Sequence, residues 1–99
     1  MSLPFYYGLP GKAHAEVLLS NGFECARDYE RHDTWVFVKK VQREGAQAPH
    51  YVPVKKGENL ERSHVRNIID GVGMSSAGYK AALQSRKRVD AIECHETLS

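Results

Sequence analysis

The residue types best suited to chemistry in this chain gather around His32. Arg31 precedes it, and Lys39 and Lys40 follow the β-branched and aromatic run Thr34–Val38. Histidine is the side chain that exchanges protons most readily near neutral pH. With cations beside it, such a histidine suits a negatively charged substrate. The plain alternative is a solvent-exposed histidine at the end of a strand.

The element that must position His32 is a strand. Valine, threonine, tryptophan and phenylalanine favour pleated structure, so Thr34–Val38 is the clearest strand signal in the chain. Alternation along a strand puts Trp35 and Phe37 on one face. With the aromatic side chains toward the core, we expect the other face to be exposed. That face carries His32, Thr34, Val36 and Val38.

Apolar periodicity, helix-ending glycines and turn residues predict the remaining elements. Pro53 lacks a donor, which favours an edge position for its strand. After Gln84 the chain either continues as a helix through Ile92 or frays. The expected elements are a helix at Lys12–Asn21, a strand at Phe23–Tyr29, a loop at Arg43–Pro49, a strand at Tyr51–Val54, a helix from about Glu61 to Val72 and a third helix capped by Ser75 and Ser76.

This order predicts an α+β fold of two layers, α-β-β-β-α, with a three-stranded antiparallel sheet covered by helices on one face. A C-terminal helical extension follows. The 99 residues suit a single domain, with a core at 10–84 and extensions at 1–9 and 85–99.

Composition narrows the classes of function. A charged fraction of 26% beside a hydrophobic fraction of 41% excludes wholesale disorder, and a net charge of +2 is mild for a nucleic-acid binder. The basic residues form short runs, which are usually solvated faces. These runs are Lys39-Lys40-Arg43, Lys55-Lys56 and Arg86-Lys87-Arg88.

The two cysteines, Cys25 and Cys94, lie in dissimilar settings and predict no disulfide framework, which makes a reducing cytoplasm the default location. Together with His95 they lack zinc-ligand spacing, so we expect no metal and no cofactor. No apolar run approaches the ~18 residues of a membrane span, and no secretory signal is evident.

Four short segments together resemble the HicA family of toxins, small mRNA-cleaving proteins of bacterial toxin–antitoxin pairs. The resemblance covers roughly Lys12 to Ser75 and depends on the order and spacing of these segments. The segments are Leu18-Leu19-Ser20-Asn21-Gly22-Phe23, His32-Asp33-Thr34-Trp35, Tyr51-Val52-Pro53-Val54, and Leu60 through Val65-Arg66-Asn67-Ile68-Ile69 to Gly73-Met74-Ser75. The resemblance implies a fold like that of double-stranded-RNA-binding domains. In place of the small or basic pair that often precedes the family's histidine, this chain has Glu30-Arg31.

The resemblance also implies metal-independent RNA cleavage, with His32 as the acid–base residue. An antitoxin protein is then the expected partner, covering the exposed face that carries His32. We expect a basic strip to attract the RNA phosphates. Its members are Arg31, Lys39, Lys40, Lys55 and Lys56.

Two other interpretations stay open. One is a non-catalytic RNA-binding module on the same scaffold, and the other is a small domain that binds a protein partner. Among the remaining histidines, His64 is expected to be a surface or half-buried helix residue, and His14 and His50 have no identifiable partners in the sequence.

Overall fold

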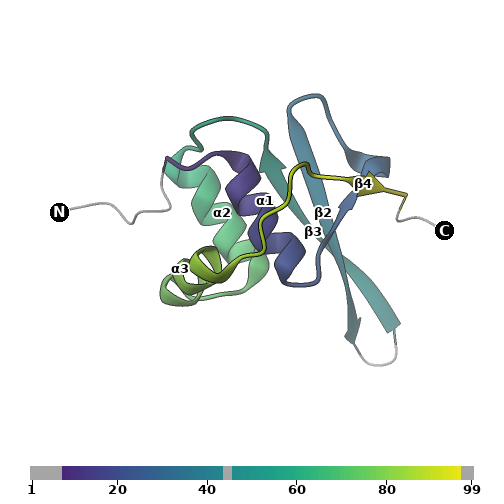
Figure 1. Ribbon diagram of the computed structural model, residues 1–99. Helices are drawn as coiled ribbons and strands as arrows, with labels where there is room; N and C mark the ends of the chain where they lie inside the picture. The colour runs from purple at the N-terminus through teal and green to yellow at the C-terminus, as the bar shows by residue number, and fades with distance from the viewer. Residues whose placement is uncertain (1–7, 44–45, 97–99) are drawn as a thin grey trace.

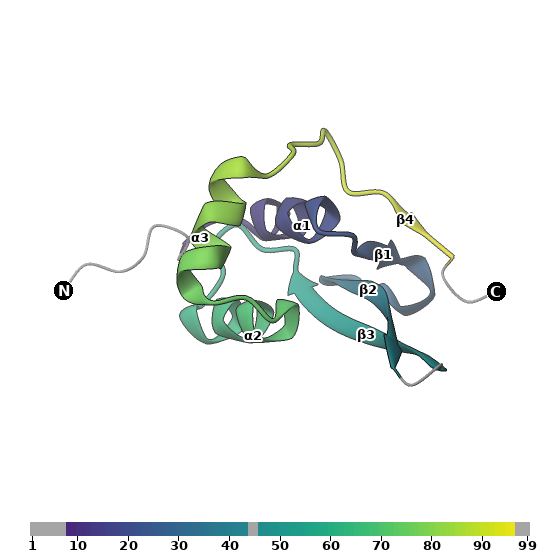
Figure 2. The same ribbon diagram turned by 90° about the horizontal axis from the view of Figure 1, so that it is seen from below.

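A four-stranded sheet forms one layer of the protein, and helices lie against one of its faces in this computed structural model (Figures 1 and 2). The structure describes residues 8–43 and 46–96; for 40–43 and 46–49 it describes the backbone alone. The elements are α1 (Gly11–Ser20), β1 (Glu24–Ala26), the 3-10 helix η1 (Arg27–Tyr29), β2 (Thr34–Arg43), β3 (Ala46–Lys55), α2 (Arg62–Val72), α3 (Ser76–Ser85) and β4 (Cys94–His95).

Helix α1 lies unusually close to the end of β3. A Cβ atom on Gly11 would meet the carbonyl oxygen of Lys55 at 1.8 Å, and the Gly11 N–H donates to the Gly57 carbonyl at 2.8 Å. Only glycine allows this approach of two backbones. At the other end, Gly22 adopts φ +86° and the Phe23 N–H donates to the Leu18 carbonyl, which ends the helix as predicted.

Strands β2 and β3 pair antiparallel from Thr34↔Lys55 to Arg43↔Ala46. The predicted loop at Arg43–Pro49 is therefore wrong, since only residues 44–45 separate the two strands. Pro49 indicated a loop because it cannot donate to a ladder, but a proline is tolerated on an edge strand. The sheet order β3-β2-β1-β4 places β3 at an edge, which confirms the prediction made from Pro53.

The first strand is much shorter than Phe23–Tyr29. Strand β1 ends at Ala26, and the chain then turns through η1 at residues 27–29. This part of the prediction is wrong because alternation within a short segment cannot distinguish an extended end from a tight helical turn. The helical turn brings Tyr29 over the outer face of the sheet, where it meets Tyr51 of β3.

Helices α2 and α3 complete the core on the inner face. Val65, Ile68 and Ile69 of α2 are buried against the sheet at the predicted spacing. The predicted stop at Gly73 is confirmed by its φ of +82°, and the predicted cap of α3 by a 3.0 Å hydrogen bond from the Gly78 N–H to Ser75 Oγ.

The prediction of a helical C-terminal extension is wrong. Helix α3 ends at Ser85, and residues 86–96 pass over α1 to pair β4 in parallel with β1 (Figure 2). The sheet is thus mixed and has four strands rather than three. Buried Glu16 of α1 holds this segment, because its carboxylate accepts 2.9 Å hydrogen bonds from Arg86 Nε and the Val89 N–H.

The prediction of no disulfide from Cys25 and Cys94 is also wrong, because Cys25 of β1 and Cys94 of β4 form one. They are partners in the strand register and lie 69 residues apart in the chain. Sequence spacing gave no sign of this pairing because β4 itself was not expected. Across the described residues, no helix is long and apolar enough to cross a bilayer.

Candidate functional site

His32 lies at the tip of a tight turn. The Arg31 N–H donates to the Thr34 carbonyl at 2.9 Å, and the Thr34 N–H donates back at 3.4 Å, which leaves His32 and Asp33 as the two turn residues. The Asp33 carboxylate accepts from the Thr34 hydroxyl at 3.2 Å. His32 therefore precedes β2 instead of lying on its outer face, and its side chain is exposed to solvent.

An open groove begins directly beside this turn. Its volume is about 670 Å³, within the ~300–1,000 Å³ of typical small-ligand sites. One wall is the segment from η1 to the His32 turn, and the floor is the outer face of β2 and β3. The groove is lined by Asp28, Tyr29, Glu30, Arg31, Val36 and Tyr51.

A pair of tyrosines gives the groove its aromatic character. The rings of Tyr29 and Tyr51 meet edge to face, with centroids 5.3 Å apart and planes at 82°. They remain 38% and 42% exposed, so large apolar surface faces the solvent on this side of the sheet. A hydrogen bond with Tyr51, then partial burial and the nearby charges of Tyr51 and Asp28, raise the pKa of Tyr29.

This pair also changes the surface that β2 was expected to present. Val38 is buried and Val36 is half-buried, although both lie on the outer face. Tyr51 is the register partner of Val38, and η1 brings Tyr29 against Tyr51. The outer face is thus a groove walled by η1 instead of an open apolar strip.

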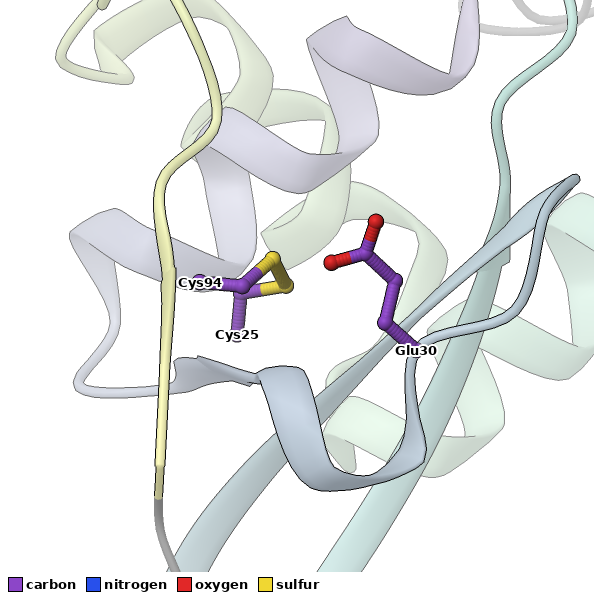
Figure 3. Close-up of side chains that lie close together, drawn as sticks. All are labelled: Cys25, Glu30 and Cys94. Carbon is purple, nitrogen blue, oxygen red and sulfur yellow. A yellow bond between two sulfur atoms is a disulfide. The ribbon is translucent and has the colours of Figure 1, made fainter.

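Glu30, the acid next to Arg31, directs its carboxylate away from the outer face. Lys56 Nζ lies 2.7 Å from Glu30 Oε2 and 5.5 Å from the ring centroid of Trp35, which packs against the core on the helix side of the sheet. Figure 3 shows the Glu30 side chain extending toward the Cys25–Cys94 disulfide. The negative charge of Glu30 is therefore paired with a lysine on the far side from the tyrosines.

The predicted basic residues do not form one strip. Lys39 donates to the Asn21 carbonyl at 3.2 Å and lies 5.5 Å from the Phe23 ring centroid, on the helix side. Lys56 is also on that side, with Glu30. Lys55 pairs with Thr34 on the outer face and is exposed. Of these residues Arg31 lines the groove, and Lys55 shares the outer face by its register with Thr34. The Lys40 side chain is outside the described part of the chain.

The other histidines have structural partners. His14 is buried, and its Nδ1 lies 2.7 Å from the Tyr79 hydroxyl. The His50 ring bonds to the Gly71 carbonyl. These contacts correct the expectation that neither histidine has a partner.

His64 is half-buried, as expected, and its Nε2 accepts from the Lys55 N–H at 3.1 Å. Burial, and then the charge of Lys55, lower the pKa of His64, while Glu61 opposes this effect. The neutral ring that results is the form able to accept this hydrogen bond. His14, His50 and His64 therefore all have roles in packing or hydrogen bonding.

Sequence reasoning missed both tyrosines of the groove. Tyr29 fell within a predicted strand, and that position did not predict a contact with Tyr51 of another strand. The sequence signal is that each is a large aromatic residue at the end of a predicted strand, which is equally typical of a core. Their pairing depends on η1, which the strand prediction did not include.

No protein-family model, curated protein sequence or solved structure matches the chain. The resemblance to the HicA toxins therefore rests on the four sequence segments alone. The chemistry open to the chain is set by the groove and the histidine turn beside it.

Proposed function

We propose that this protein is a HicA-like endoribonuclease on a scaffold like that of double-stranded-RNA-binding domains, and that it cleaves mRNA in the cytoplasm without a metal. The observation that carries the proposal is the placement of His32. It is an exposed imidazole in a tight turn, adjacent to Arg31 and to an open groove with an aromatic pair.

The chemistry follows from the RNA itself. A 2′-hydroxyl that attacks the neighbouring phosphorus must lose a proton, and the departing 5′-oxygen must gain one. His32 accepts the first proton as a base and returns one as an acid. Arg31 stabilises the negative charge that develops on the phosphate oxygens. DNA lacks the 2′-hydroxyl and is not cleaved by this route.

The groove supplies the binding energy that such a reaction needs. Exposed tyrosine rings accept nucleobases by stacking, which contributes roughly 1–3 kcal/mol per base. Tyr29 and Tyr51 provide these rings beside the histidine turn. Lys55, exposed on the same side of the sheet, attracts the phosphate backbone.

The same arrangement suggests how the activity is controlled. A partner protein that fills the groove would cover the tyrosines and exclude RNA from His32. An antitoxin with an acidic segment would pair with Arg31 and Lys55 while it does so. Inhibition would then need no change in the fold.

The test is cleavage of single-stranded RNA in the presence of a metal chelator. We expect His32→Ala to lower the cleavage rate by at least ~10²-fold, because a positioned acid–base group typically contributes that much. His95→Ala is the matched control, since His95 is also exposed but lies in β4. It should cleave at the wild-type rate.

The outcomes separate the alternatives. Cleavage that survives in His32→Ala would refute the assignment of the catalytic residue. RNA that is bound but not cut by the wild-type protein would favour the non-catalytic RNA-binding module. A wild-type protein that neither binds nor cuts RNA would favour a protein-interaction domain.

A further inference from the structure

A second cluster of reactive side chains lies on the helix side of the sheet. Cys25, Cys94 and Glu30 each offer one ligand atom, and these atoms all lie within 4.8 Å of one another (Figure 3). They come from β1, from β4 and from the segment that follows η1. The fold brings together three groups that sequence spacing does not relate.

The cysteines are joined in this structure, but the proposed function puts the protein in a compartment that reduces disulfides. On this point alone the inference rests on the proposed function. Reduction takes two electrons from a thiol or phosphine reductant and leaves two thiols. The two protons come from the thiol reductant or, with a phosphine, from a water molecule whose oxygen passes to the phosphine oxide. The Cα atoms of the two cysteines are 4.4 Å apart on neighbouring strands, and Cys25 is fully buried.

We propose that the reduced chain binds Zn²⁺ through the sulfurs of Cys25 and Cys94 and a carboxylate oxygen of Glu30. Zinc takes thiolates at about 2.3 Å and carboxylate oxygens at about 2.0–2.2 Å in a tetrahedral arrangement. Ligand atoms in such a site are about 3.5–3.8 Å apart, so the two sulfurs must move apart once their bond is reduced. A carboxylate oxygen of Glu30 already lies within 4.8 Å of both sulfurs. Water completes the fourth position.

Lys56 favours this site in two ways. Its ammonium group holds Glu30 Oε2 at 2.7 Å, which leaves Oε1 for the metal and fixes the orientation of the carboxylate. It also completes the charge balance. Two thiolates and one carboxylate carry three negative charges, which Zn²⁺ and Lys56 neutralise together.

The metal would replace the disulfide as the link between β4 and β1. Binding of Zn²⁺ to the two thiols releases their two protons and breaks no other bond. Disulfide and metal exclude each other because both use the same sulfur atoms. Strand β4 is then held on the sheet in oxidising and in reducing conditions alike.

The experiment titrates the full-length chain, reduced with a phosphine, with Co²⁺ as a spectroscopic substitute for Zn²⁺. We expect a thiolate-to-cobalt charge-transfer band that Zn²⁺ abolishes by displacement. Glu30→Gln should weaken Co²⁺ binding by at least ~10-fold, and Lys56→Met by about 10-fold. Glu24→Gln is the matched control, because Glu24 is exposed one residue before Cys25. Its affinity should equal that of the wild type.

A second measurement uses the wild-type chain alone, so it does not depend on whether a variant folds. Zn²⁺ should slow the alkylation of both thiols in the reduced protein. Absence of the charge-transfer band, unhindered alkylation with Zn²⁺, or a Glu30→Gln affinity equal to wild type would each overturn the proposal. So would an identical band in the disulfide-bonded chain. None of these results depends on RNA cleavage, so this proposal and the proposed function can fail separately.

Discussion

Glu16 shows how one side chain can fix the path of a distant segment. It lies buried on α1, and its two carboxylate oxygens accept from Arg86 Nε and from the Val89 N–H. Burial alone would raise the pKa of Glu16, but the hydrogen bonds and the charge of Arg86 outweigh it, so the pKa is lowered from 4.5. The ionised carboxylate therefore stabilises the fold.

We predict that Glu16→Gln lowers the free energy of unfolding by about 2 kcal/mol at neutral pH. Glutamine keeps one acceptor oxygen and has an NH2 group in place of the other. Either Arg86 Nε or the Val89 N–H would then face this donor group and lose its hydrogen bond. Urea denaturation measures the loss. Glu24→Gln, at an exposed site, should stay within about 0.5 kcal/mol of wild type.

The stabilisation by the Glu16 carboxylate depends on pH in a definite direction. A lowered folded-state pKa means that the stabilisation is present above the unfolded-state value near 4.5 and is lost as the pH falls through the folded-state value. The difference in free energy of unfolding between wild type and Glu16→Gln should therefore become smaller in acid. A gap that stays constant from neutral pH down to acid would contradict this role of Glu16.

At the scale of elements, the contact between α1 and the end of β3 is limited by Gly11. We predict that Gly11→Ala destabilises the protein by about 3 kcal/mol, because the new methyl group overlaps the Lys55 carbonyl and two backbones must separate. Gly57→Ala is the control, since its Cβ would meet Leu60 at an ordinary 3.8 Å. Equal thermal denaturation midpoints for the two variants would show that α1 does not approach β3 this closely.

Sequence patterns recovered the elements whose signals are local. The apolar face of α2, the stop at Gly73, the cap at Ser75 and the edge position of β3 follow from residue type and period. Strand β4 could not be predicted because two residues have no period, and their pairing depends on β1. The same holds for the groove, where His32 could be singled out by type but its tyrosine neighbours could not.

At the scale of the whole molecule, the basic side chains are distributed between the two faces of the sheet. Arg31 and Lys55 lie on the groove side, whereas Lys39 and Lys56 are bound to groups on the helix side. Under the proposed function, Arg31 and Lys55 are therefore the cations expected to contact the RNA phosphates. This division predicts which lysines affect RNA binding.

We predict that Lys55→Ala reduces the salt dependence of RNA binding by about 0.7 in the slope of log K against log salt, the value for one lost phosphate contact on a single strand. Lys39→Ala should leave the slope unchanged. Fluorescence anisotropy in the His32→Ala background keeps the RNA intact during the measurement. Equal changes in slope for both variants would contradict the assignment of the two lysines to different faces.

The ends of the cleaved RNA test the central claim most directly. Attack by the 2′-hydroxyl with proton transfer by His32 leaves a 2′,3′-cyclic phosphate on one fragment and a 5′-hydroxyl on the other. Mass spectrometry of the products formed by the wild-type protein with a chelator present identifies these groups. We predict cyclic phosphate ends in that reaction. Fragments that carry 3′-hydroxyl and 5′-phosphate ends would contradict the account, because water would then be the nucleophile instead of the ribose.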